Sequence, residues 1–378
     1  MDEIIKVMVV FGTRPEAVKM CPLIKVLQKE PKIMCHVCLT GQHEEMLLQV
    51  MDFFGIQADY NLHIMKKNQT LSLITANILS SLEKVLEKEN PNLLLVHGDT
   101  TSSYVAALAG FYLQIPVGHV EAGLRTYNIF QPYPEEFNRR SIDIVSSIFF
   151  APTEIAKQNL IKEGKSNEDV YVTGNTVIDA LRTTVSENFS HELLKWAAKS
   201  RIILLTVHRR ENIGTPMQNI FRAIQRITME NPDIKFIFPI HKNPKVRAIA
   251  NDILSDNKSI RVVEPLELFD FHNFMSRCYF VMTDSGGIQE EAPALGKPVL
   301  VMRDMTERPE GVIAGTLKLV GTSEDNIYCE ASRLLHDNKA YLKMSKAVNP
   351  YGNGYASEHI RDIILQRFGI SFDKTEEK

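Results

Sequence analysis

Short apolar runs alternate with helix-length amphipathic stretches along the chain. In the first half the runs are continuously apolar, which is typical of parallel strands covered on both faces. The pattern predicts six strands in this half, at residues 4–11, 35–40, 93–97, 117–121, 148–151 and 170–173. Repeated strand–helix units of this kind predict a Rossmann-like domain that ends near Gly174.

The pattern restarts after a polar, helical connection at residues 175–200. It predicts a second set of strands at residues 202–207, 235–240, 261–263, 280–283, 299–302 and 317–320. We therefore expect an α/β protein with two Rossmann-like domains, at residues 1–174 and 175–355, that face each other across a cleft. Because open α/β sheets bind ligands at the carboxyl ends of their strands, polar residues that end strands in both halves are expected to converge there.

The composition of the 378 residues is that of an ordinary globular protein. Hydrophobic residues make up 44% and charged residues 24% of the chain. The formal net charge of -3 provides no basic field, so we expect no nucleic-acid partner. The N-terminal sequence lacks the order of a signal peptide and no apolar run is long enough to span a bilayer, so we expect a cytoplasmic protein that contacts no membrane.

Five cysteines include a pair spaced as CxxC, formed by Cys35 and Cys38. The pair falls in a predicted strand rather than at the start of a helix, and no second pair follows. We therefore predict neither a redox role nor a metal site.

A glycine-rich turn follows the predicted strand at residues 280–283. Its residues Ser285, Gly286 and Gly287 precede a predicted helix, and Glu291 lies one helical turn further on. Backbone N–H groups and the helix dipole at such a place favour an anion, so the turn is a candidate phosphate site and Glu291 a candidate ribose ligand. The alternative is a connecting turn in which glycine only relieves steric crowding.

Charged residues also follow the predicted strands of the first half. Arg14 and Lys19 come after the first strand, where they could reach a diphosphate or simply lie on a solvated helix terminus. Asp99, Glu121 and Glu135 follow later strands or open a helix, although Asp99 could instead be a helix N-cap. Three carboxylates at the mouth of one sheet suggest proton abstraction and return, because neighbouring like charges raise the pKa of at least one of them.

The second half places His208 and His241 at strand ends, and Arg308 after the strand that follows the glycine turn. His208 could act as an acid or bind phosphate, or it could be an ordinary core histidine. Together these residues predict a nucleotide diphosphate held between the domains, with proton chemistry on the first-domain side. The chain carries neither a Walker A motif nor a strand-borne GxGxxG, so we expect no NAD or other cofactor.

At this point the chain resembles the bacterial UDP-N-acetylglucosamine 2-epimerases of the non-hydrolysing type. The resemblance covers almost the whole chain and rests on a series of segments in order, among them FGTRPEAVKM, VHGDTTSS, GHVEAGLRT, QPYPEEFNRR, TVHRRENIG, TDSGGIQEEAPALGKPVL and TERPEG. It implies a glycosyltransferase-B-like architecture in which a C-terminal helix at residues 356–378 packs back on the first domain. It also implies a homodimer that interconverts UDP-N-acetylglucosamine and UDP-N-acetylmannosamine, which would supply cell-surface polysaccharide.

The resemblance also implies roles for single residues. The implied reaction removes the proton on carbon 2 and expels UDP, giving a 2-acetamidoglucal that is reprotonated on the other face as UDP returns. The implied catalytic residues are Asp99, Glu121, Glu135 and His208. The implied substrate-binding residues are Arg14, Lys19, Arg139, Phe271, Ser285, Gly286, Gly287, Glu291 and Arg308. Which carboxylate acts on which face of the sugar stays open.

Many bacterial members also bind UDP-N-acetylglucosamine at a regulatory site. The matching residues are Gln42, His43, Glu136, Arg210 and His241. This chain carries Glu45 and Asn68 where relatives commonly carry Gln and Arg, which should weaken diphosphate binding. A hydrolysing epimerase, a glycosyltransferase of the same architecture and a non-catalytic sensor are the alternatives.

Overall fold

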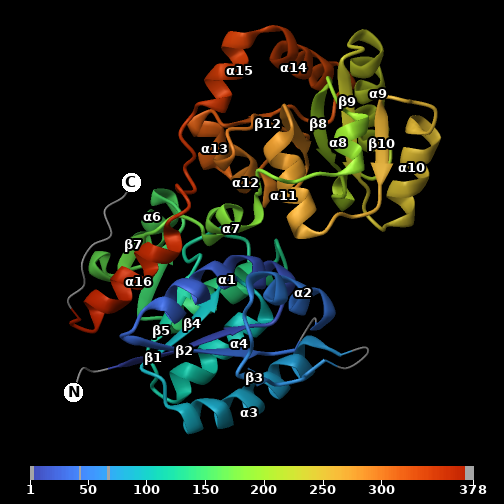
Figure 1. The fold of residues 1–378 in the computed structure, drawn as a ribbon. Helices are drawn as coiled ribbons and strands as arrows, with labels where there is room; N and C mark the ends of the chain where they lie inside the picture. The colour runs from blue at the N-terminus through green and yellow to red at the C-terminus, as the bar shows by residue number, and fades with distance from the viewer. Residues whose placement is uncertain (1–3, 42–43, 66–68, 371–378) are drawn as a thin grey trace. The chain divides into compact units, whose positions relative to one another are not determined.

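The computed structural model describes residues 4–41, 44–65 and 69–370. The protein is α/β, with two parallel sheets that belong to two compact units (Figure 1). Unit 1 comprises the chain up to Ala180 together with the segment from Tyr351 onward, and unit 2 comprises Leu181–Pro350. The predicted fold class, α/β with two Rossmann-like sheets, is confirmed.

The sheet of unit 1 has the order β3-β2-β1-β4-β5-β6-β7, with every pair parallel. Its strands are β1 (Ile5–Phe11), β2 (Ile33–Leu39), β3 (Tyr60–Asn61), β4 (Leu93–His97), β5 (Val117–Val120), β6 (Ile148–Ala151) and β7 (Val170–Val172). The prediction of six strands was wrong by one among the described residues. The missed strand, β3, is a two-residue edge strand, which is too short to give a hydrophobic pattern.

Helices join these strands on both sides of the sheet. They are α1 (Arg14–Lys29), α2 (Glu44–Phe54), α3 (Leu71–Glu89), α4 (Thr101–Tyr112), α5 (Glu135–Val145), α6 (Glu154–Lys162) and α16 (Ala356–Arg367), with a short 3-10 turn at Asn167–Asp169. Met8 and Val10 of β1 pack with Ile78 and Leu82 of α3 on one face, and Val9 is buried on the other. Burial on both faces explains why these strands are apolar throughout. Helix α16 packs against α1.

The sheet of unit 2 has the order β10-β9-β8-β11-β12-β13 and is also parallel. Its strands are β8 (Arg201–Thr206), β9 (Ile234–Pro239), β10 (Ile260–Val263), β11 (Phe280–Thr283), β12 (Val299–Val301) and β13 (Leu317–Leu319), each within one or two residues of the prediction. The helices are α8 (Glu192–Trp196), α9 (Thr215–Glu230), α10 (Pro244–Leu254), α11 (Leu268–Arg277), α12 (Ile288–Ala294), α13 (Pro309–Ala314), α14 (Glu324–His336) and α15 (Asn338–Ser345). A 3-10 turn at Arg210–Asn212 follows β8, and α7 (Thr176–Thr184) runs from unit 1 into unit 2.

The strand orders place one switch point in each sheet. In unit 1 the chain passes from β1 to β2 on one side and from β4 to β5 on the other side of the sheet's centre. In unit 2 the chain likewise passes from β8 to β9 on one side and from β11 to β12 on the other. At a switch point the loops after the two central strands leave to opposite faces and open a crevice for a ligand. Gly12 and Asp99 follow β1 and β4, and His208 and Ser285 follow β8 and β11. The candidate residues therefore lie where the topology of each sheet favours binding.

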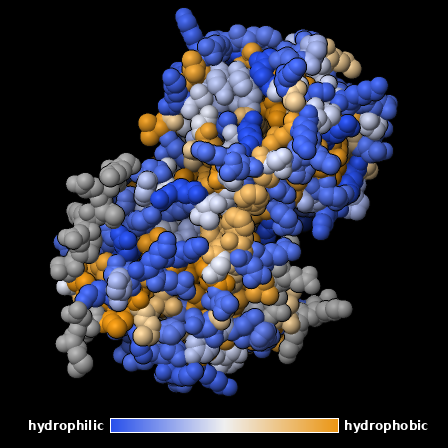
Figure 2. Space-filling model, viewed as in Figure 1, coloured by the Kyte–Doolittle hydropathy of each residue, from blue (hydrophilic) through white to orange (hydrophobic). Residues whose placement is uncertain are grey.

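On the face drawn in Figure 2 hydrophilic residues predominate, and apolar residues lie in separate patches on both units, as on most folded proteins. Within the described ranges, none of the helices is long and apolar enough to cross a membrane.

Candidate active site

A buried glutamate joins the two loops at the switch point of unit 1. Glu16, in the first turn of α1, accepts hydrogen bonds at one carboxylate oxygen from the backbone N–H groups of Gly12 (3.1 Å) and Thr13 (2.8 Å). Its other oxygen accepts from the hydroxyls of Thr100 and Ser103, both at 2.7 Å, which belong to the loop and helix after β4. The sequence analysis missed Glu16, although Thr13 and Glu16 have the spacing of a helix capping box.

Glu121 follows β5 directly, and its side chain is largely buried at 8% exposure. Its backbone has φ of 66°, a left-handed conformation that is strained for a residue with a Cβ atom and is commonest at functional sites. Lys19 Nζ contacts the carboxylate, and Asn175 Nδ2 donates to the same oxygen at 2.7 Å. A buried carboxylate is costly without a partner, and the Glu121 carboxylate has Lys19 and Asn175 as partners.

Asp99 lies in the next loop, beside Glu121. A Cβ atom placed on Gly98 would lie 3.6 Å from Glu121 Oε1, so the Glu121 carboxylate lies against the turn that carries Asp99. Arg139 of α5 forms an ion pair with the Asp99 carboxylate, and Asn138 Nδ2 donates to the Asp99 carbonyl at 2.9 Å. The alternative that Asp99 is the helix N-cap was wrong.

The N-cap of α4 is Thr100, whose hydroxyl accepts from the Ser103 backbone N–H at 3.0 Å. Glu135 opens α5, the helix that supplies the Arg139 and Asn138 contacts to Asp99. One oxygen of Glu135, Oε2, is buried and has no hydrogen-bond partner among the described residues. Asp99, Glu121 and Glu135 thus lie at the same edge of the sheet of unit 1.

A second layer of buried charges supports this edge. His119 Nε2 lies 2.7 Å from the Gly98 carbonyl oxygen and His119 Nδ1 lies 2.6 Å from Asp143. Arg125 bonds both Asp143, at 2.6 Å, and Glu163, at 2.7 Å. Burial on its own raises the pKa of Asp143, but the charges and hydrogen bonds of His119 and Arg125 outweigh it, so the pKa is lowered and the carboxyl stays ionised. These side chains come from distant segments and meet only when the protein folds. The sequence alone could therefore not identify this series of hydrogen bonds.

Among the residues of unit 1 that the family resemblance assigns to a regulatory site, the structure describes the side chain of Glu136. Glu136 is fully buried and accepts hydrogen bonds from the backbone N–H groups of Thr126 and Tyr127, both at 3.0 Å, so it holds the loop before α5. Gln42, His43 and Asn68 lie outside the described residues, as does the side chain of Glu45. Arg14 is the first residue of α1 and is partly exposed.

In unit 2 a buried aspartate holds the switch point together. Asp284, which follows β11, accepts hydrogen bonds from the backbone N–H groups of His208 and Arg209 at 3.0 and 2.9 Å. The amide of Asn212 donates to the same carboxylate at 3.0 Å. The Asp284 side chain therefore points back to the loop after β8 and fixes it, instead of pointing outward to a ligand.

His208 is left on the outer side of that loop, with its side chain 37% exposed. Its ring stacks on His241, with centroids 5.7 Å apart and planes at 22°. Burial lowers the pKa of His208, and Coulombic interactions with His241 and Arg209 lower it further, while the Asp284 carboxylate opposes them. The ring is therefore neutral at neutral pH and has both a donor and an acceptor nitrogen.

The glycine turn is shaped by side chains that approach it. Neither Gly286 nor Gly287 has a positive φ. A Cβ atom on Gly286 would lie 2.7 Å from Glu307 Oε1, and one on Gly287 would lie 3.2 Å from Glu291 Oε1. The glycines thus make room for two carboxylates. The Ser285 backbone N–H is already bonded to Thr283 Oγ1 at 2.9 Å.

Glu291 is held by a buried histidine that the sequence analysis passed over. His272 Nε2 lies 3.2 Å from Glu291 Oε2, and His272 Nδ1 lies 2.6 Å from Thr184 Oγ1. Phe271, beside His272 on α11, is partly buried and packs on the apolar core between that helix and the sheet. The carboxylate of Glu291 and the ring of Phe271 thus come from neighbouring helices, α12 and α11.

Three arginines surround two carboxylates next to the glycine turn. Glu307 accepts hydrogen bonds from Arg209 at 2.8 Å and Arg303 at 2.6 Å, and Arg308 pairs with the buried Glu290. Although burial raises the pKa of Glu307, the positive charges of Arg303, Arg308 and Arg209 lower it to about 2. Arg210 is exposed at the start of its 3-10 turn, and His241 is exposed after β9.

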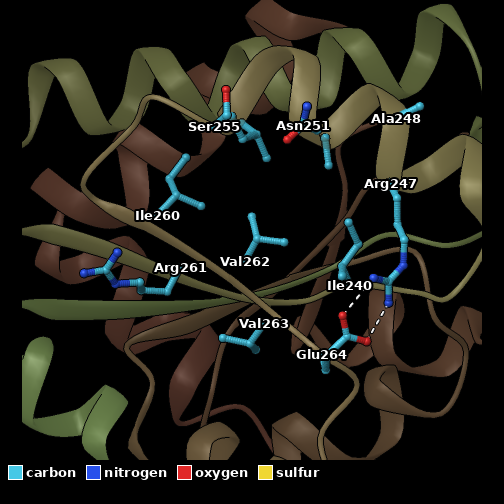
Figure 3. Close-up of a pocket in the computed structure, with 12 residues that line it drawn as sticks. Ile240, Arg247, Ala248, Asn251, Ser255, Ile260, Arg261, Val262, Val263 and Glu264 are labelled. Atoms are coloured by element: carbon cyan, nitrogen blue, oxygen red, sulfur yellow. Dashed lines mark hydrogen bonds and ion pairs between the residues drawn. The ribbon is translucent and has the colours of Figure 1, made fainter.

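A pocket of about 810 Å³ lies elsewhere in unit 2, between α10 and the edge strand β10 (Figure 3). Its middle is apolar, around Ile240, Ile260 and Val262, and at one end Arg247 bonds Glu264 at 2.6 and 2.8 Å. No candidate residue lines it. Of its three charged side chains, Arg247 and Glu264 bond each other and Arg261 lies over the Trp196 ring, so it has no evident chemistry. Across the ranges that the structure describes, no group of three or more histidine, cysteine, aspartate and glutamate residues is arranged to hold a metal ion.

The fold and these clusters define an α/β protein of the doubly wound type with charged groups at the switch point of each sheet. The family described as UDP-N-acetylglucosamine 2-epimerase matches residues 25–365. The UDP-N-acetylglucosamine 2-epimerase of Bacillus subtilis (strain 168) is 53% identical over 365 residues, 97% of this chain and 96% of that protein.

Solved structures agree with this match. A crystal structure of a UDP-N-acetylglucosamine 2-epimerase has a TM-score of 0.92 at 50% identity, covering 100% of this chain and 99% of that one. The UDP-GlcNAc 2-epimerase from Neisseria meningitidis, bound to UDP-GlcNAc, has a TM-score of 0.86 at 49% identity, covering 96% and 100%. The chain belongs to the UDP-N-acetylglucosamine 2-epimerase family, so the predicted family and isomerase class are confirmed, and these relatives have the predicted glycosyltransferase-B-like fold.

The pKa of Glu307 predicts how its contribution to stability changes with pH. Because the folded-state pKa of about 2 is below the ordinary 4.5, the contribution is complete above about pH 4.5 and is lost as the pH falls towards 2. Glu307→Gln should lower the free energy of unfolding at pH 7 by about 1–2 kcal/mol, because two arginines lose an ionised acceptor. In urea titrations this deficit should be smaller at pH 3.5 than at pH 7.

The matched control is Glu211→Gln, which removes the exposed carboxylate that bonds the same Arg303 at 3.0 Å. That variant should change the free energy of unfolding by less than about 0.5 kcal/mol. A Glu307→Gln deficit that stays constant between pH 7 and pH 3.5 would show that the ionised carboxylate is not what stabilises this cluster.

Proposed function

We propose that the protein interconverts UDP-N-acetylglucosamine and UDP-N-acetylmannosamine by removing and returning UDP. A base takes the proton from carbon 2 while UDP leaves carbon 1, which gives UDP and a 2-acetamidoglucal. Carbon 2 is then protonated from the opposite face as UDP returns to carbon 1. The observation that most supports this reaction is the buried, strained Glu121 carboxylate beside Asp99 in a chain of this family.

Unit 1 would act on the sugar in this proposal. Asp99, Glu121 and Glu135 would remove and return the proton, because carboxylates with different partners can keep different proton affinities at one site. Glu121 contacts Lys19, Asp99 contacts Arg139, and one oxygen of Glu135 has no hydrogen-bond partner among the described residues. Arg14, Lys19 and Arg139 would contact the charged and hydroxyl groups of the substrate.

Unit 2 would bind UDP. Ser285, Gly286 and Gly287 would contact phosphate, and Arg308 would neutralise the diphosphate. Glu291, oriented by His272, would accept hydrogen bonds from the ribose hydroxyls, and Phe271 would contact uracil. His208 would donate a hydrogen bond to the departing diphosphate. Its neutral ring can do so because it keeps one N–H group.

Incubation with UDP-N-acetylglucosamine in heavy water tests the reaction. NMR should show deuterium at carbon 2 in intact UDP-sugars of both configurations, because the proton returned to carbon 2 comes from solvent. Free N-acetylmannosamine would instead indicate a hydrolysing epimerase. An unchanged substrate would leave a glycosyltransferase that needs an acceptor, or a sensor that only binds.

Two substitutions test the proton-transfer residues. Asp99→Asn and Glu121→Gln should each lower kcat by about 10²- to 10⁴-fold, the range for loss of a general acid or base, while UDP affinity measured by calorimetry stays within a few-fold. Glu83→Gln, a surface carboxylate on α3, is the matched control and should keep full turnover. Wild-type turnover in either active-site variant would remove that residue from the proposed mechanism.

We further propose that activation by UDP-N-acetylglucosamine is weaker in this protein than in its relatives. Glu45 replaces a neutral amide and Asn68 replaces a guanidinium in the family pattern, and both changes disfavour a diphosphate. Initial rates with UDP-N-acetylmannosamine alone should therefore show little sigmoidality. The double variant Glu45→Gln, Asn68→Arg should increase it, whereas strong sigmoidality in the unmodified chain would contradict the proposal.

We also propose a homodimer formed through α4 and α5. Phe111 and Tyr112 on α4 and Ile144 on α5 are more than half exposed, and Tyr104 and Phe137 meet edge to face where these packed helices begin. Light scattering should give twice the chain mass of 42.9 kDa, and Ile144→Asp should halve it. Met229→Asp, at an equally exposed apolar residue of α9, should leave the mass unchanged, and a monomeric unmodified chain would contradict the proposal.

We propose that the reaction takes place in the cytoplasm and supplies N-acetylmannosamine units for a cell-surface polysaccharide. This role is supported by the chemistry of the proposed product, because a transferase that polymerises sugars requires a nucleotide-activated sugar. Loss of the gene should remove N-acetylmannosamine from the surface polymer, and an unchanged polymer would contradict this role.

A further inference from the structure

His97, the last residue of β4, has a buried ring nitrogen without a hydrogen bond. Its side chain is 4% exposed, and Nε2 has no hydrogen-bond partner among the described residues. A buried polar atom left in this state is destabilising, so it calls for an explanation. The ionised atom that Nε2 faces is Glu121 Oε2, 3.7 Å away, which is beyond hydrogen-bond range.

The same carboxylate oxygen already receives two other donors. Lys19 Nζ contacts it, and Asn175 Nδ2 donates to it at 2.7 Å. In the tautomer that carries its proton on Nε2, His97 is a third donor that lies next to Glu121 without bonding to it. A displacement of about 1 Å would bring Nε2 into the normal range of about 2.7–3.2 Å for a hydrogen bond.

We propose that His97 is a positioning residue that donates its Nε2–H to Glu121 when Lys19 turns to the substrate. The inference rests on the proposed function, in which Lys19 contacts the substrate and Glu121 transfers the proton. When the ammonium leaves, Glu121 would lose its cation and one of its donors together. The imidazole then fills the vacated position and keeps the carboxylate aimed at carbon 2.

The charge of His97 suits this exchange. Burial lowers the pKa of His97 to about 3, and the positive charges of Lys19 and His119 add to the lowering while Glu121 opposes it. The ring is therefore neutral at neutral pH. A neutral donor orients a carboxylate without the strong Coulombic attraction of an ammonium group, so Glu121 would have more affinity for a proton after the exchange than before it.

Substrate binding and activation of the base would thus be linked. Before binding, the titratable groups near Glu121 include Lys19, His97 with His119 behind it, and Asp99 on the adjacent turn. In the complex Lys19 is committed to the substrate and His97 remains. The base would gain its full proton affinity only when a substrate is in place.

Two substitutions of His97 separate this role from packing. Glutamine can place an N–H near the Nε2 position, whereas methionine fills similar space without a donor. His97→Met should lower kcat by about 10- to 100-fold with KM within about threefold, and the acid limb of the kcat–pH profile should move by about one unit to higher pH. His97→Gln should keep kcat within about fivefold of wild type and the acid limb in place.

The control is His36 on β2, a second histidine whose Nε2 lacks a hydrogen bond and lies 3.6 Å from a carboxylate, that of Glu89. His36→Met should leave kcat and its pH profile unchanged. Thermal unfolding of all three variants reports whether a loss of activity reflects loss of the fold.

The results separate the two proposals. If the unmodified chain fails to incorporate deuterium at carbon 2, the proposed function is wrong. If it does so and His97→Met matches it in kcat and pH profile, only the role of His97 is overturned. Equal losses in His97→Gln and His97→Met, with an unmoved acid limb, would likewise assign His97 to packing alone.

Discussion

The geometry of both candidate clusters depends on a buried carboxylate that ties two strand ends together. Glu16 joins the loops after β1 and β4, and Asp284 joins the loops after β8 and β11. Each carboxylate is nearly inaccessible to water and accepts hydrogen bonds from two backbone N–H groups and from side-chain hydroxyls or an amide. Because a buried charge loses several kcal/mol when such bonds break, the loops cannot open at this point without a large cost. The candidate residues on these loops are therefore held in fixed positions.

The two anchoring carboxylates and the residues next to them have different structural roles in both units. The anchoring carboxylates are fully bonded and point inward, whereas the neighbouring His208 is partly exposed on the outer side of its loop. Strain is concentrated at Glu121, whose φ of 66° is held by its contacts to Lys19 and Asn175. Gly123, two residues on, has a φ of 85° and lies so close to Ala156 that a Cβ atom would be 2.2 Å from its carbonyl oxygen. The tight turn after β5 thus fixes where the Glu121 backbone can be.

The sequence predicted the strands well because parallel strands buried on both faces leave an unbroken apolar run. It missed β3 because two edge residues leave no run at all. It selected Asp99, Glu121 and His208 as candidates because each lies within two residues of the end of such a strand. It did not find Glu16, His119 or His272, since each acts through partners far along the chain, and only the fold brings those partners together. The N-cap interpretation of Asp99 failed because Thr100, one residue later, carries a hydroxyl that reaches the Ser103 N–H.

The close approach of Glu307 to Gly286 has a consequence for how this protein can vary. The glycine turn and the arginine cluster are closely packed, because a Cβ atom at position 286 would lie 2.7 Å from Glu307 Oε1. Glu307 in turn gathers Arg209 and Arg303. An alanine at 286 is therefore compatible only with a shorter or displaced residue at 307, and then with a different arrangement of both arginines. A substitution at position 286 therefore requires a compensating shift or substitution at position 307.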